Sequence, residues 1–132
     1  MKSLNSFLKP KRKDHLKFIL SDAFIDETGK PIEWEMRQLT AKEGLALQNQ
    51  ISEQNYTKIM TVYASEAMVY PNLHDRELLD GLSEQAGRPI LKASDALVQM
   101  LTDSELAEVI NQYTKYNDLT GGIMDKVEEA KN

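Results

Sequence analysis

The chain has 132 residues, a formal net charge of −5 and no cysteine, which fits one domain with a modest core. The lack of cysteine excludes disulfides, thiolate metal sites and cysteine nucleophiles, and the negative charge argues against a general nucleic-acid binder. No apolar run approaches the roughly 20 residues that span a bilayer, and no signal-peptide pattern is present, so we expect a soluble cytoplasmic protein without membrane or nucleic-acid partners.

Residues 1–15 predict a flexible basic arm, with five basic side chains against one acidic side chain. The apolar pair Phe7 and Leu8 favours one helical turn before Pro10. Residues 117–132 predict a flexible acidic tail, and the last 30 residues hold seven acidic side chains against three lysines. Oppositely charged ends are typical of interaction segments or of self-association, although both ends are also compatible with plain solvated surface.

Residues 16–38 predict a β-hairpin, because apolar and polar side chains alternate with period two on both sides of a turn. Gly29 can supply the positive φ of that turn, and Pro31 fits a strand start or an edge. A two-stranded hairpin is marginal by itself, so helices must cover its apolar face. The side chains of that face are Leu16, Phe18, Leu20, Ile32, Trp34 and Met36.

The following residues predict about five short helices. Capping-box pairs place two helix starts, at Thr40 with Glu43 and at Thr102 with Glu105. Pro71 ends the second helix, and a glycine directly after the third helix ends that one. The first expected helix begins at residue 40, the next three span about 55–69, 75–86 and 89–101, and the fifth spans 102–116. Residues 123–131 favour a further short, frayed helix.

Together these elements predict a mainly α fold with a small N-terminal β-hairpin, an α+β class built as a bundle of about five short helices. The hairpin at 16–38 and the helices at 40–116 are expected to form a single domain over 16–116.

The sequence offers no catalytic motif. Phosphate-binding loops, dinucleotide-binding glycines and nucleophile elbows are missing, so we predict no enzyme, no cofactor and no metal. His74 precedes a carboxylate, Asp75, but neighbours along a helix do not face each other, and Asp75 fits a helix cap. Glu33 and Glu35 lie on one strand face and read as its solvated side. A Ser–His–Asp triad that only the fold brings together leaves no local sequence motif, so this alternative stays open.

Because no catalytic motif is present, the function left to consider is the binding of another protein at the surface. Methionine adapts to varied apolar partners and tyrosine is enriched at interfaces. Such residues recur on the stripe of the second expected helix and on the two last helices, although the simpler interpretation places most of them in the core. The candidate protein-binding side chains are Tyr56, Met60, Tyr63, Met68, Leu97, Met100 and Val109.

Several segments carry a resemblance to a known family. They are the start MKSLNSFLK, PIEWE at 31–35, PNLHDREL at 71–78 and, in pattern only, the helical stretch 91–113. In this order they resemble the XkdN-like tail assembly chaperones of Bacillus-type prophages over nearly the whole chain. One departure lies at 81–87, where the family often has a Ser-Tyr-Gly turn.

The resemblance implies a chaperone that binds the phage tape measure protein, keeps its apolar helices soluble, helps to recruit tail tube subunits and leaves before the virion is complete. It also implies a longer, frameshifted form of the chain as a further partner, and the ending at 130–132 is compatible with a slippery codon run. We hypothesise that the partner helix lies in a groove lined by the 56–69 and 91–113 segments. The alternatives are a structural tail or connector protein, a small enzyme and a host adaptor.

Overall fold

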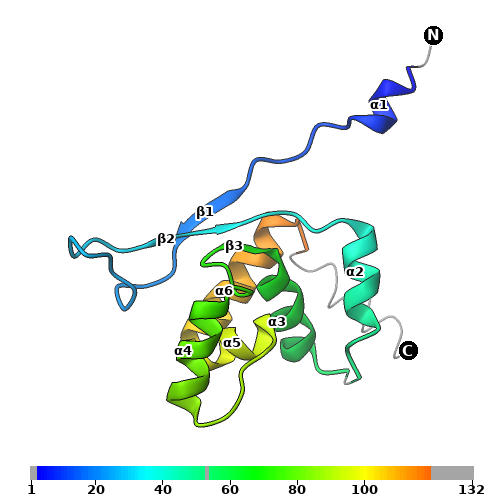
Figure 1. Ribbon diagram of the computed structural model, residues 1–132. Coiled ribbons are helices and arrows are strands. Elements are labelled where there is room, and N and C mark those ends of the chain that lie inside the picture. Colours follow the sequence, from blue (N-terminus) through cyan, green and yellow to red (C-terminus); the bar gives the residue numbers. More distant parts are fainter. Residues whose placement is uncertain (1–2, 53, 120–132) are drawn as a thin grey trace.

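The computed structural model describes residues 3–52 and 54–119 (Figure 1). In this part of the chain six helices accompany a three-stranded antiparallel sheet, which confirms the mainly helical α+β fold. The expected helix at 123–131 and the 130–132 ending lie outside the described residues. The elements are α1 (Asn5–Leu8), β1 (Leu16–Ile19), β2 (Glu33–Met36), α2 (Ala41–Gln48), α3 (Tyr56–Ala67), β3 (Met68–Tyr70), α4 (Arg76–Ala86), α5 (Ala93–Met100) and α6 (Asp103–Tyr116).

The predicted hairpin is confirmed by the antiparallel pairing of β1 with β2, which sets Phe18 opposite Trp34. Its turn is built around Asp26, whose Oδ1 accepts hydrogen bonds from the backbone N–H groups of Thr28 (2.8 Å) and Lys30 (3.0 Å). Gly29 has φ +84°, the left-handed conformation that glycine adopts most easily. The Thr28 hydroxyl, followed by these backbone donors, lowers the pKa of Asp26.

The prediction of helix up to residue 69 is wrong at its end, because residues 68–70 form strand β3. This strand adds to the other edge of β2, where Met36 pairs with Met68, and the Arg37 N–H donates to the Ala67 carbonyl at 2.9 Å. An open strand edge offers unpaired backbone groups, and Pro71 disfavours helical geometry at the residue before it. The last residues of an otherwise helical sequence pattern therefore pair with the sheet.

Both predicted capping boxes are confirmed, at Thr40–Glu43 and at Thr102–Glu105. The fourth expected helix, in contrast, starts at Ala93 instead of residue 89. The preceding segment stays non-helical because its backbone is used otherwise: the Ile90 N–H donates to the Ser83 hydroxyl oxygen at 2.8 Å.

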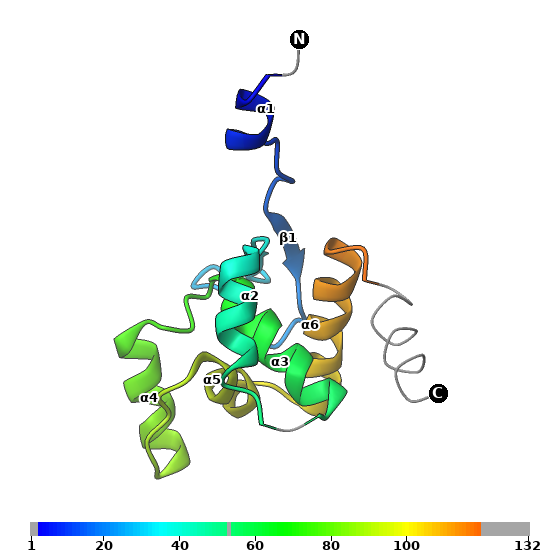
Figure 2. The same cartoon turned by 90° about the vertical axis from the view of Figure 1, so that its right-hand side faces the viewer.

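The core lies where the apolar face of the sheet meets the helices. Trp34 stands edge-on to Phe24, with ring centroids 5.2 Å apart. Helix α3 packs on α5 and α6 (Figure 2), so the buried side chains of all three helices meet beneath the sheet. Fully buried members of the core include Trp34, Met36, Met60, Ala64, Leu73, Ile90, Leu97 and Val109.

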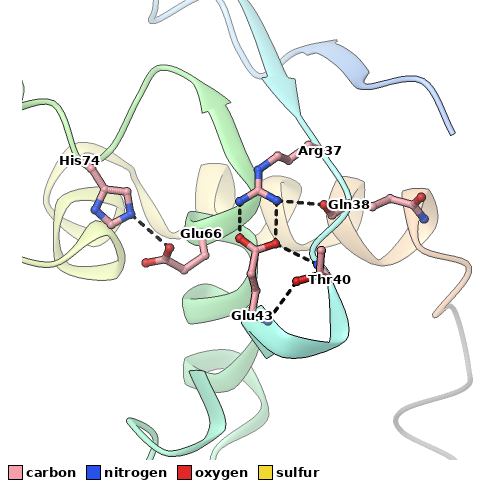
Figure 3. A network of polar contacts seen from close by, with 6 residues as sticks. All are labelled: Arg37, Gln38, Thr40, Glu43, Glu66 and His74. Atoms are coloured by element: carbon pink, nitrogen blue, oxygen red, sulfur yellow. Dashed lines mark hydrogen bonds and ion pairs between the residues drawn. The ribbon is translucent and has the colours of Figure 1, made fainter. Parts of the chain in front are cut away.

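A polar network fixes the start of α2 against the end of β2 (Figure 3). The Arg37 guanidinium donates to both carboxylate oxygens of Glu43 and to the Gln38 carbonyl. One oxygen of that carboxylate also accepts the N–H of Thr40, at 2.9 Å. The same guanidinium therefore connects the sheet with the cap of the first long helix.

Candidate protein-binding surfaces

Four of the seven candidate binding side chains lie in the core. Met60, Met68, Leu97 and Val109 are buried, so they are not accessible to a partner in this conformation. The stripe that made them candidates is the face with which the helices pack on each other. The three that remain partly accessible are Tyr56, Tyr63 and Met100.

A groove lies between α3 and α5, the two segments between which the sequence led us to expect one. Its main hollow has a volume of about 450 Å³ and is lined by Val62 from α3, Val98 from α5 and Ile51 from the link after α2. Ile51 also belongs to an adjoining hollow of about 250 Å³, which lies between α3 and the link after α2 and which Ile59 and Tyr63 line. We call the two hollows together the α3–α5 groove.

The groove exists because α3 carries more apolar side chains than the core covers. Met60 and Ala64 point into the core, whereas Ile59, Val62 and Tyr63 form a second row at helical spacing that stays partly exposed. On α5, Val98 is 56% exposed. Of this row the sequence singled out Tyr63 alone. Ile59 and Val62 were not among the binding candidates, and the signal for them was the presence of apolar residues on two faces of one helix.

A second hollow, the sheet–α4 cleft, has a volume of about 410 Å³ and lies between the hairpin, α4 and the end of α5. Met100 is the only candidate residue from the sequence that lines it, and Gln85 and Gln99 supply amide groups. Its lining is otherwise mostly apolar and includes Phe24, Ile32, Trp34, Tyr70, Leu78 and Leu82.

The two histidines contact carboxylates at the surface. His74 Nε2 lies 3.1 Å from Glu66 Oε2 (Figure 3), and His15 Nδ1 lies 2.7 Å from Glu35 Oε2. Within residues 3–52 and 54–119 no three His, Cys, Asp or Glu side chains gather in a way that would hold a metal ion. None of the helices in this part of the chain combines the length and apolar character that crossing a bilayer requires.

Comparison with known proteins decides the family. The model of the phage XkdN-like tail assembly chaperone proteins matches residues 4–131. The chain belongs to this family. Its general role is therefore that of a phage tail assembly chaperone, as the resemblance in the sequence implied.

Among solved structures, the crystal structure of the protein YqbN is similar to this XkdN-like chaperone. The two chains share 18% sequence identity with a TM-score of 0.69, and the match covers 89% of this chain and 98% of that one. At this identity the likeness shows a common fold and nothing further. No curated protein matches the chain.

Proposed function

We propose that this chaperone binds the tape measure protein by holding apolar faces of its helices in the α3–α5 groove. The observation that carries the proposal is the second apolar row of α3, which continues across the groove to Val98 of α5. An amphipathic helix that lays its apolar face into such a groove buries apolar surface on both partners. A shallow groove suits a partner that must later be released.

The polar margin of the groove supports the same occupant. Glutamine and serine side chains, with Lys92 and Asp95, surround the apolar row. A polar rim around an apolar centre is the usual anatomy of a protein-binding surface.

Val98→Asp tests the proposal, because it places a charge in the groove at a side chain that is 56% exposed and therefore adds little strain to the fold. We expect co-purification of the co-expressed tape measure protein to fall at least tenfold. Ile25→Asp is the matched control, since Ile25 is 53% exposed on the hairpin and outside the groove. Unchanged capture by folded Val98→Asp protein would contradict this location.

We further propose that the loaded chaperone recruits tail tube subunits in the cytoplasm of the bacterial host and takes no part in bond-making chemistry. The family role supports this extension. Mass spectrometry of purified tails separates the proposal from a structural tail or connector protein: an assembly chaperone is absent from finished particles, whereas a connector is present in a fixed ratio to the tube protein. Adding tube protein to the tape measure complex should yield a three-component complex.

A further inference from the structure

The tip of the N-terminal arm presents large apolar side chains to solvent. Leu4, Phe7 and Leu8, in and next to α1, are 78%, 79% and 73% exposed, and none of the residues of α1 is buried. Both views show α1 projecting away from the folded body (Figures 1 and 2). Three such side chains on one turn form a compact apolar knob that gains from burial against another surface.

The base of this arm is fixed to the end of α6. Lys13 Nζ lies 2.7 Å from Asp118 Oδ2 and donates to the Tyr116 carbonyl at 2.8 Å. The Tyr116 hydroxyl donates to the Asp14 carbonyl at 2.7 Å. These contacts direct the arm away from its own body, so the knob is presented outward.

The sheet–α4 cleft is suited to receive this knob. An apolar cavity of about 150 Å³ holds benzene, so a cleft of about 410 Å³ has room for a phenyl ring and a leucine side chain. Phe24 and Trp34 line it as an edge-to-face pair, a surface on which a third aromatic ring packs well.

Charge favours the same pairing. The described part of the arm before Lys13 carries three basic side chains, Lys9, Lys11 and Arg12, and no acidic one. The hairpin loop at 20–32 and helix α4, which border the cleft, each carry three acidic side chains against one basic. A basic arm is therefore attracted to the rim of the cleft.

We propose that α1 of one copy of this chain docks in the sheet–α4 cleft of a second copy, with Phe7 and Leu8 inserted. The knob and the cleft are different surfaces, so the contact is head-to-tail and leaves one arm and one cleft free for further copies. Such contacts build chains or rings of the chaperone. This site is separate from the α3–α5 groove, and self-assembly through it does not depend on binding of the tape measure protein.

Two variants and their mixture test the proposal by analytical ultracentrifugation of the full chain alone. The wild-type mass should rise with concentration above that of one chain. Phe7→Asp replaces the inserted aromatic ring of the knob by a charge, and Gln99→Arg places a cation in the cleft that repels the basic arm. Each variant should sediment as a monomer. Mixed in equal amounts they should form a 1:1 dimer and nothing larger, because one intact arm meets one intact cleft.

Leu91→Asp is the matched control, because Leu91 is 76% exposed and borders neither the arm nor the cleft. It should assemble like the wild type. Wild-type protein that stays monomeric, Phe7→Asp protein that assembles normally, or monomeric variants that form no dimer on mixing would each overturn the proposal. Phe7→Asp should still capture the tape measure protein, so failure here is distinguishable from failure of the α3–α5 groove.

Discussion

Arg37 and Glu43 form an ion pair through two parallel hydrogen bonds, with Nη1–Oε1 and Nη2–Oε2 distances of 2.9 and 2.6 Å (Figure 3). The pair joins the residue after β2 to the first turn of α2, so a sheet end and a helix start are held in one geometry. The guanidinium, followed by the Thr40 N–H, lowers the pKa of Glu43 to about 2. The same contact with Glu43 raises the pKa of Arg37.

The pH dependence of stability should reflect this pair. The folded-state pKa of Glu43, about 2, lies below its ordinary value of 4.5. Its contribution to the free energy of unfolding is therefore complete above pH 4.5 and is lost as the pH falls toward 2. Glu43→Gln keeps an acceptor for the Thr40 N–H but removes the charge, so at pH 7 we expect a loss of up to about 1 kcal/mol for this partly exposed pair.

Urea unfolding of the wild type and Glu43→Gln at a series of pH values measures this difference. Taking the difference removes contributions from Asp26 and Glu105, whose pKa values are also lowered. The two stability curves should converge between pH 4.5 and 2. A difference that stays constant down to pH 2 would rule out the Glu43 charge as its source.

Met60 and Tyr63, two of the candidate binding residues, should respond differently to truncation. Met60 is 2% exposed, so Met60→Ala should lower the free energy of unfolding by about 2–5 kcal/mol through the cavity that it leaves. Tyr63 is partly exposed and lines the groove, so Tyr63→Ala should cost less stability and instead weaken capture of the tape measure protein.

Urea unfolding gives the stability of both variants, and capture is compared only at a temperature where both are folded. If Tyr63→Ala lost as much stability as Met60→Ala and left capture unchanged, Tyr63 would have to be assigned to the core alone.

The fold was largely predictable because its signals are local. Period-two alternation identified β1 and β2, and the residues at Thr40 and Thr102 identified two helix starts. Strand β3 was not predictable, since Met68 would be buried equally well at the end of a helix. Pro71 disfavours helical geometry at the residue before it, but the pairing of residues 68–70 as a strand depends on the open edge of β2, a feature of the tertiary structure.

The sequence named two segments between which a hollow does lie, but it did not name most of the side chains that line this hollow. The hypothesis of a groove between the 56–69 and 91–113 segments came from the need of a helix-binding chaperone for an apolar groove between its own helices. Most of its lining could not be named in this way, because the strongest apolar stripe is the one that folding buries, as Leu97 and Val109 are. The side chains left for a partner form a weaker second row, and Val98 looks like an isolated surface residue until α3 lies beside α5.

Ser83 should be important for stability although it carries no charge. Its hydroxyl oxygen accepts the N–H of Ile90 at 2.8 Å, and the hydroxyl donates to the Leu79 carbonyl at 2.7 Å. Ile90 is fully buried, so Ser83→Ala leaves its N–H without this acceptor and should cost about 1–3 kcal/mol. Thermal unfolding should show the loss, with Ser104→Ala as an exposed serine control. Equal stability of the two variants would contradict the role assigned to Ser83.

Substitution by alanine at two glycines of the α4 region should change the free energy of unfolding in opposite directions. Gly81 lies within α4, and a Cβ added there meets nothing within 4 Å, so Gly81→Ala should raise the free energy of unfolding by about 0.5–1 kcal/mol. Gly87 caps α4 in the left-handed conformation with φ +69°. A Cβ there also meets nothing, but the backbone geometry disfavours alanine, so Gly87→Ala should lower stability by about 1–2 kcal/mol.

Because both substitutions add the same methyl group to open space, the sign of each change reports backbone conformation alone. Urea unfolding of the two variants and the double variant measures it, and the double variant should lie near the sum of the single effects. A gain of stability in Gly87→Ala would mean that α4 does not end in a left-handed residue. The path of the chain from α4 to Ile90, a fully buried member of the core, would then have to be different.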